Sequence, residues 1–271
     1  MYYPVAPGSL FYRVTGIGEN WPNPVLGLGA YFNKGGRFNR AGDATVYCSE
    51  DPLVVICETA FYQALDWQHR ISVHRFQDMV YPLESAHRLW CFTIDPVPVI
   101  IDLENANTVH QFQYSPHLLL QPSLNPRHGP QLAGQPTSRD YVGTQELADE
   151  IRAFVPLVGP RPDGVKAPSV RLKRKHGFQP FQLALFVYPP IINQIPYEQR
   201  AVQVAQWELR LRFLQDTPRV AVTPNTVDID WTRPQFMLRG VGAPAIPAYA
   251  MRPKAKPYRC NQWYNLEIRY A

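Results

Sequence analysis

Hydrophobic and polar residues alternate at every second position in several short segments of the chain. Such alternation, with an enrichment in aromatic and β-branched residues, is typical of β-strands that bury one face. The segments that we predict as strands are Ser9–Thr15, Ala44–Ser49, one or two strands within His87–Leu103, a strand after Asp163, Phe181–Tyr188, Gln206–Leu214, Asn225–Trp231 and Tyr264–Tyr270. The last three lie in residues 191–271, which we expect to form a β-rich C-terminal extension packed on the rest.

Two segments carry the spacing and the starting signals of helices. Thr144–Phe154 begins with a capping residue and an acidic first turn, and apolar residues at helical spacing follow. The other helix is expected after the polar capping residues Ser49 and Asp51, with Pro52 in its first turn. We expect it to run to about Trp67.

One carboxylate falls on the apolar face of this second helix. Residues three and four apart lie on the same side of a helix, which places Glu58 in a stripe of apolar residues. The stripe consists of Val54, Phe61, Tyr62 and Leu65. A charge in such surroundings is costly unless a nearby group pairs with it, so Glu58 is a candidate functional residue.

Proline and glycine mark the irregular parts of the chain. Many of the 28 prolines are clustered, and because proline lacks a backbone donor these clusters indicate loops and sheet edges. Residues 105–140 are rich in Pro, Gln, His and Asn, and we predict a long loop or an insertion there. In the turn GGRFNRAG, Gly35, Gly36 and Gly42 permit unusual backbone angles.

The composition indicates a globular protein. The chain has 271 residues, of which 45% are hydrophobic, so we expect a packed core. The net charge of +5 suits anionic small molecules or nucleic acid, but basic residues are dispersed apart from the run RLKRK, which is typical of a solvated turn. We find neither a signal peptide nor an apolar run of bilayer-spanning length, and therefore predict a cytoplasmic protein that does not bind membranes.

The cysteines and histidines show no metal-binding pattern. The four cysteines fit neither a zinc knuckle nor a CxxC redox pair, and the seven histidines lack spacings such as HExxH. We therefore predict no metal, and small buried thiols in a reducing compartment. The Gly16–Gly18 stretch is not a dinucleotide fingerprint, so a dinucleotide would bind without a Rossmann fold.

Four features, taken together, resemble the RES domain family, which is named for its Arg, Glu and Ser. They are FYRVT around Arg13, GGRFNRAGDATVYCSEDPLVVICETAF around Tyr47 and Glu58, DGVKAPSVR around Ser169, and the order of these pieces. The resemblance covers Ser9–Tyr188. It implies an α+β fold similar to ADP-ribosyltransferases, with a split β-sheet core and flanking helices. We accordingly expect an NAD-binding catalytic domain in residues 1–190, followed by the extension.

The resemblance also implies a function. Many RES proteins are toxins that cleave the bond between the nicotinamide and the ribose of NAD, with water, phosphate or a protein side chain as acceptor. Their usual antitoxin is an Xre-type protein that covers the cleft. NAD would therefore be the substrate, and an Xre-type protein a partner.

Each candidate site residue has an expected role in this reaction. Cleavage develops positive charge on the ribose, which the Glu58 carboxylate would stabilise. Arg13 would bind the pyrophosphate or ribose with its forked cation, and Arg37 is a second candidate for the phosphates. Tyr47 would stack on the nicotinamide, and the Ser169 hydroxyl would hold Glu58 or a ribose oxygen. Tyr12, beside Arg13 on the predicted strand, would face the core instead.

Several readings remain open from the sequence. Hydrolysis or phosphorolysis of free NAD leads, because no acceptor-recognition feature is evident, and the alternative is ADP-ribosyl transfer to a protein. A non-enzymatic nucleic-acid-binding protein is a further alternative, although no nucleic-acid-binding motif is present. A RES relative that binds NAD without turnover is disfavoured because all three namesake positions are filled. The sequence leaves open whether the protein is a homo-oligomer.

Overall fold

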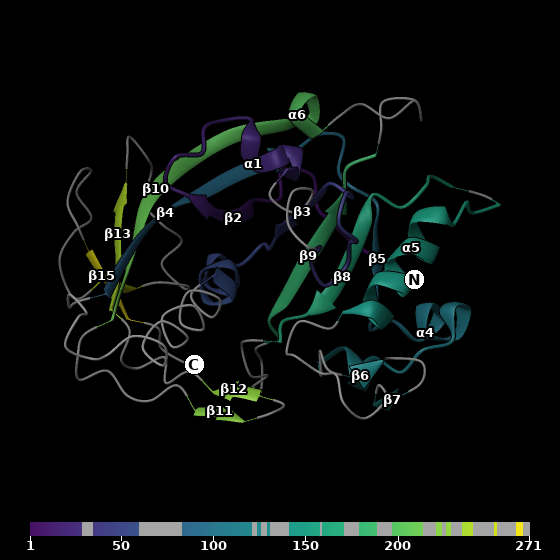
Figure 1. Cartoon of the computed structure of the whole chain (residues 1–271). Helices are drawn as coiled ribbons and strands as arrows, with labels where there is room; N and C mark the ends of the chain where they lie inside the picture. The colour runs from purple at the N-terminus through teal and green to yellow at the C-terminus, as the bar shows by residue number, and fades with distance from the viewer. Residues whose placement is uncertain are drawn as a thin grey trace.

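The computed structural model describes residues 1–28, 35–59, 83–120, 124–125, 129–130, 141–157, 159–170, 179–188, 197–213, 221–223, 226–228, 235–240, 252–253 and 264–267. Two large sheets and the helices around them make up this part of the chain (Figure 1). The predicted α+β class with a core split between two sheets is therefore confirmed.

The five-stranded sheet follows the order β1-β5-β8-β9-β3. Its strands are β1 (Tyr2–Tyr3), β5 (Ile100–Asp102), β8 (Gly164–Pro168), β9 (Phe181–Phe186) and β3 (Thr45–Cys48). β5 and β8 run parallel, whereas the other neighbours are antiparallel. Strand β3 stands at the edge of this sheet and leads directly into the helix that carries Glu58.

The six-stranded sheet follows the order β14-β15-β13-β10-β4-β2 and is antiparallel throughout. Its strands are β14 (Arg252–Pro253), β15 (Tyr264–Glu267), β13 (Gln235–Gly240), β10 (Ala201–Phe213), β4 (Leu83–Ile94) and β2 (Phe11–Gly16). The register pairs β10 with β4 from Ala201 opposite Ile94 to Phe213 opposite Leu83. This sheet thus joins strands from both sides of residue 190.

Two small hairpins complete the strands, β6 (Leu124–Asn125) with β7 (Gly129–Pro130), and β11 (Ala221–Thr223) with β12 (Thr226–Asp228).

The described helices are α1 (Asn23–Leu26), an unlabelled helix at 52–59, α4 (Ala106–Phe112), the 3-10 helix η2 (Pro116–Leu120), α5 (Val142–Ala153) and α6 (Tyr197–Arg200). Two of them, α4 and α5, cover the outer face of the five-stranded sheet, whereas α1 and α6 lie beside β3 and the start of β10 (Figure 1). Both α4 and η2 lie within 105–140, where the sequence suggested a loop or an insertion. The Asn105 side chain accepts a hydrogen bond from the Asn107 N–H and so starts α4 despite the polar composition. Among the described residues, no helix has both the length and the apolar character to cross a membrane.

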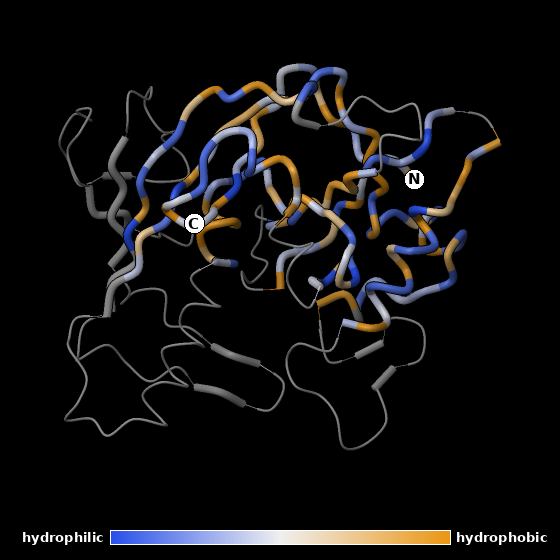
Figure 2. Tube along the Cα trace, turned by 45° about the horizontal axis from the view of Figure 1, so that its top comes forward, coloured by the Kyte–Doolittle hydropathy of each residue, from blue (hydrophilic) through white to orange (hydrophobic). Residues whose placement is uncertain are grey.

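Two hydrophobic clusters lie on opposite faces of the five-stranded sheet. One joins the sheet to α4 and α5, and its members include Phe112, Leu147, Ile151, Val165 and Phe186. The other joins it to the six-stranded sheet, and its members include Phe11, Val46, Trp90, Ile100 and Leu183. Figure 2 shows hydrophobic and hydrophilic residues alternating along the long strands of the six-stranded sheet. Burial of these apolar side chains provides the main favourable free energy of folding.

A buried ion pair fastens the two sheets to each other near the start of β8. The Nη1 atom of Arg200, just before β10, lies 3.2 Å from Oδ1 of Asp163, just before β8, and both side chains are at most 8% exposed. Asp163 Oδ2 accepts a hydrogen bond from the Val99 N–H, and Arg200 Nη2 donates one to the Pro96 carbonyl. Removing one charge of such a pair leaves the other charge buried and unpaired in a medium of low polarity, which destabilises the fold.

We expect Asp163→Asn to lower the free energy of unfolding by about 3 kcal/mol, the lower end of the range for broken buried ion pairs. Urea denaturation followed by circular dichroism measures the change. Asp95→Asn is the matched control, since Asp95 is exposed and the substitution removes the same charge. Equal unfolding midpoints for the two variants would contradict the role assigned to the pair.

Candidate functional site

Ser49 is the point at which both sheets and the Glu58 helix meet. Its backbone forms a bridge with Tyr12 of β2, through hydrogen bonds of 2.7 and 3.0 Å. Its Oγ donates to the Phe181 carbonyl at the start of β9 and accepts from the Asp51 N–H. Asp51 Oδ1 then accepts from the Leu53 N–H, as a capping residue does. The predicted helix start at Ser49 and Asp51 is confirmed, whereas residues 60–67 of the predicted helix lie outside the described residues.

Glu58 is buried on this helix and meets Ser169. The Glu58 residue is 8% exposed and Ser169 is 1% exposed. Ser169 Oγ donates a hydrogen bond of 2.8 Å to Glu58 Oε1. Ser169 follows the last residue of β8, and its N–H donates to the Pro180 carbonyl just before β9. The predicted contact between Ser169 and Glu58 is thus present, whereas Phe61, Tyr62 and Leu65 of the predicted apolar stripe lie outside the described residues.

Arg37 reaches the same end of β8 from the glycine-rich turn. Its Nη1 donates a hydrogen bond of 2.8 Å to the Pro168 carbonyl, and its Nη2 donates to the Leu119 carbonyl. The residue is 5% exposed, and its guanidinium lies 4.8 Å from the centre of the Phe38 ring. These contacts fix the backbone beside Ser169. The expected contact of Arg37 with phosphates stays a prediction.

Tyr47 holds the glycine-rich turn from β3. Its hydroxyl donates to Asn39 Oδ1 at 2.7 Å and accepts from the Phe38 N–H at 2.8 Å. An added Cβ at Gly36 would come within 2.6 Å of this hydroxyl, which explains the glycine there. Asn39, which sequence reasoning missed, is fully buried, and its side chain also bonds the Gly36 N–H and the Arg40 and Asp43 carbonyls. The stacking of Tyr47 on nicotinamide stays a prediction.

Arg13 lies beside Tyr47, on the edge strand of the other sheet. Burial lowers the pKa of the Arg13 guanidinium, while the nearby Cys48, Glu19 and Tyr47 side chains act in the opposite direction. Its Nη1 atom is buried and has no hydrogen-bond partner among the described residues. A buried donor without an acceptor costs free energy, and an anionic ligand could accept a hydrogen bond from it. Tyr12, as predicted, faces the core, where it is 2% exposed and packs on Trp207.

The neighbouring thiols do not supply a nucleophile. Cys48, Cys57 and Cys91 are free and buried, as predicted, whereas Cys260 lies outside the described residues. Burial raises the pKa of the Cys57 thiol, and the adjacent Glu58 charge adds to this effect. Burial likewise raises the pKa of Cys48 and, to about 11, that of Cys91. Within the described ranges, no group of three or more His, Cys, Asp or Glu side chains could hold a metal ion.

The candidate residues therefore form one connected set. Arg37 contacts the residue before Ser169, Ser169 contacts Glu58, and Tyr47 contacts the residue after Arg37. Arg13 adds a positive charge beside Tyr47. A buried carboxylate can stabilise positive charge on a ligand, and a guanidinium whose buried Nη1 has no partner in the described part of the chain can bind negative charge on it.

We expect Tyr47→Phe to lower the free energy of unfolding by about 1–3 kcal/mol, because the Phe38 N–H loses its acceptor and Asn39 Oδ1 loses one donor while keeping the Gly36 N–H. Thermal or urea unfolding measures the loss. Tyr2→Phe provides the control, since Tyr2 is 43% exposed. A Tyr47 variant as stable as the control would show that the hydroxyl does not anchor the turn.

The chain is similar to a solved structure and to the model of a protein family. A solved structure with a similar chain is described as the crystal structure of the M. tuberculosis MbcT-MbcA toxin-antitoxin complex, with 16% sequence identity and a TM-score of 0.41, covering 72% of this chain and 83% of the other. No curated protein matches the chain significantly. The model of the RES domain family matches residues 11–212, which include Arg13, Glu58 and Ser169. The resemblance found in the sequence is thereby confirmed, and the chain belongs to the RES domain family.

Proposed function

We propose that this protein consumes NAD by cleaving the bond between the nicotinamide and the ribose. The observation that carries the proposal is the buried Glu58 carboxylate, held by Ser169 and set in the same connected group as the Arg13 cation. Family membership supports NAD as the substrate, since the RES resemblance implies it. The chemistry of the residues supports the type of reaction.

The reaction breaks one bond and forms another. The N-glycosidic bond breaks with its electron pair passing to nicotinamide, which leaves as a neutral molecule, and the ribose carbon becomes positively charged. Water then adds to this carbon and loses a proton, or phosphate adds through one of its oxygens. Glu58 stabilises the charge that appears on the ribose, and in a site shielded from water this effect is worth several kcal/mol.

Ser169 keeps the carboxylate in place for this role. Its hydroxyl donates to one oxygen of Glu58, which limits the orientations that the carboxylate can adopt toward the ribose. The adjacent Cys57 does not compete as a nucleophile, because its raised pKa keeps the thiol neutral. Arg13 binds the negatively charged pyrophosphate, which would satisfy its buried Nη1.

The proposal has three versions, which differ in whether water, phosphate or a protein side chain accepts the ADP-ribosyl group. Purified protein is incubated with NAD, with and without phosphate, and nicotinamide release is followed by chromatography. Release without phosphate means hydrolysis, and release only with phosphate means phosphorolysis. Label transferred from NAD to a co-purified protein means ADP-ribosyl transfer. NAD that stays intact under all these conditions would contradict the proposal, and a salt-sensitive gel shift would then favour nucleic-acid binding.

We expect Glu58→Gln to lower kcat about 100- to 1,000-fold, as the loss of one transition-state electrostatic contact does. The glutamine keeps the shape and an oxygen that accepts the Ser169 hydroxyl, so the substitution removes only the charge. Glu104→Gln is the control, because Glu104 lies after β5 and its carboxylate is 3.9 Å from Lys166 Nζ. Full turnover in the Glu58 variant would disprove the role of its charge.

The same variant tests whether the protein is a toxin. Expression of the wild type should arrest growth, expression of Glu58→Gln should not, and co-expression of an Xre-type partner should restore growth. Healthy cells that contain active enzyme would contradict toxicity while leaving the reaction itself intact.

We expect Arg13→Lys to raise KM for NAD about tenfold, with a smaller change in kcat, because lysine keeps the charge but loses the fork that grips a pyrophosphate. Steady-state kinetics measure both constants. Arg88→Lys is the matched control, since the Arg88 guanidinium already donates to the Glu19 carbonyl within the protein. An unchanged KM in the Arg13 variant would remove Arg13 from the NAD-binding residues.

A further inference from the structure

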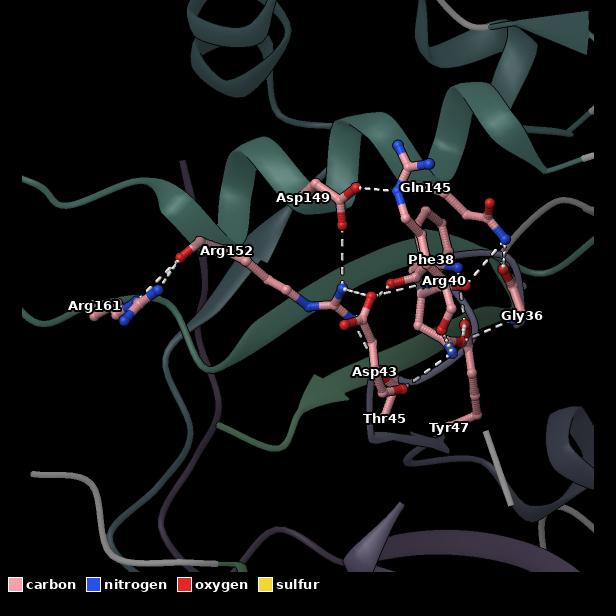
Figure 3. A network of polar contacts seen from close by, with 11 residues as sticks. Gly36, Phe38, Arg40, Asp43, Thr45, Tyr47, Gln145, Asp149, Arg152 and Arg161 are labelled. Atoms are coloured by element: carbon pink, nitrogen blue, oxygen red, sulfur yellow. Dashed lines mark hydrogen bonds and ion pairs between the residues drawn. The ribbon is translucent and has the colours of Figure 1, made fainter. Parts of the chain in front are cut away.

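Helix α5 contacts the glycine-rich turn through hydrogen bonds and ion pairs, from the side opposite Tyr47. Figure 3 shows three α5 side chains, Gln145, Asp149 and Arg152, directed at the segment 36–45. Gln145 Nε2 donates to the carbonyls of Gly36 and Asn39, at 2.9 and 3.0 Å. Asp149 pairs with Arg40 of the segment at 2.6 Å. None of these residues was singled out from the sequence.

Arg152 makes the densest set of these contacts. Its Nη2 donates to the Phe38 carbonyl at 3.0 Å and to Thr45 Oγ1 at 2.9 Å, and its Nη1 lies 3.0 Å from Asp43 Oδ2. One guanidinium therefore binds the segment near its start and at its end. The plane of the group also lies over the Phe186 ring of β9, at 4.4 Å from the ring centre.

We propose that Arg152 is a positioning residue for the cleavage of NAD, acting on Glu58 through the segment 36–45. This inference rests on the proposed function. Arg152 fixes the Phe38 carbonyl, the preceding residue Arg37 fixes the Pro168 carbonyl, and the next residue after Pro168 is Ser169, which holds Glu58. The steps are hydrogen bonds, single peptide units and the buried Arg37 side chain. A shift of the segment is thus passed to the carboxylate.

Arginine suits this position better than lysine does. A planar guanidinium offers donors in fixed directions, and here they reach a main-chain carbonyl, a hydroxyl and a carboxylate at once. An ammonium is a compact charge that cannot span these acceptors while covering an aromatic ring. The Arg152 side chain is 15% exposed, so little water is available to replace the lost contacts.

The test uses Arg152→Ala and Arg152→Lys in the nicotinamide-release assay. We expect kcat to fall about 10- to 100-fold in both variants, since small displacements of catalytic groups have effects of this size. KM for NAD should change much less, because Arg13 is untouched. Added methylguanidinium should restore part of the turnover of Arg152→Ala by refilling the vacated position, whereas tetramethylammonium, which has the charge but no donors, should not.

Arg88→Ala is the matched control. Arg88 also donates to a main-chain carbonyl and lies over an aromatic ring, that of Trp90, but it donates to Glu19 and Asn20, which are outside the segment. We expect its turnover to stay near that of the wild type and not to respond to methylguanidinium.

The outcomes separate this inference from the proposed function. An active wild type with an equally active Arg152→Ala overturns the positioning role alone. So does a variant whose lower activity follows only from a smaller folded fraction, with kcat per folded molecule unchanged and no response to methylguanidinium. A wild type that releases no nicotinamide overturns the proposed function, and this inference falls with it.

Discussion

The arrangement of the site depends on the bridge between Ser49 and Tyr12. This bridge ties the edge of the six-stranded sheet to the end of β3, and it lies one residue from Arg13 and two residues from Tyr47. The same serine fixes the start of β9 and the start of the Glu58 helix through its hydroxyl. Because Ser49 is fully buried, water cannot replace these bonds, and the two sheets and the helix keep one relative position.

Starting from Ser49, a series of contacts through the helix, Glu58 and Ser169 returns to the start of β9, which Ser49 also contacts, and so forms a closed ring. The helix leads to Glu58, Glu58 accepts from Ser169, and the Ser169 N–H donates to the Pro180 carbonyl, next to the Phe181 carbonyl that Ser49 binds. The carboxylate is therefore held from both ends of the ring. A closed ring of buried bonds limits the rotamers that Glu58 can adopt, which is the preorganisation that electrostatic stabilisation of a transition state requires.

The sequence predicted elements with a clear period and missed contacts to the main chain. The alternation in β10, the aromatic and apolar residues of β2 and β9, and the capping signals at Ser49 and Asp51 arise from local physics, so they can be recognised in the sequence. The main-chain acceptors of Arg37 and Arg152 are carbonyls up to 131 residues away, and every residue type has a carbonyl. No sequence pattern therefore marks these partners, and Asn39, Gln145 and Arg152 were found only in the structure. The helix α4 was missed because a polar composition concealed the cap at Asn105.

The glycine-rich turn illustrates how these two kinds of information combine. Its glycines were expected to supply unusual backbone angles, and Gly35 and Gly42 do have positive φ values of 88° and 92°. Gly36 does not, and it is needed instead because the Tyr47 hydroxyl occupies the place of a side chain. The turn is thus compressed between Tyr47 on one side and α5 on the other. A segment held this tightly can transmit a small shift to Ser169 and Glu58, since packed elements move as units rather than deforming continuously.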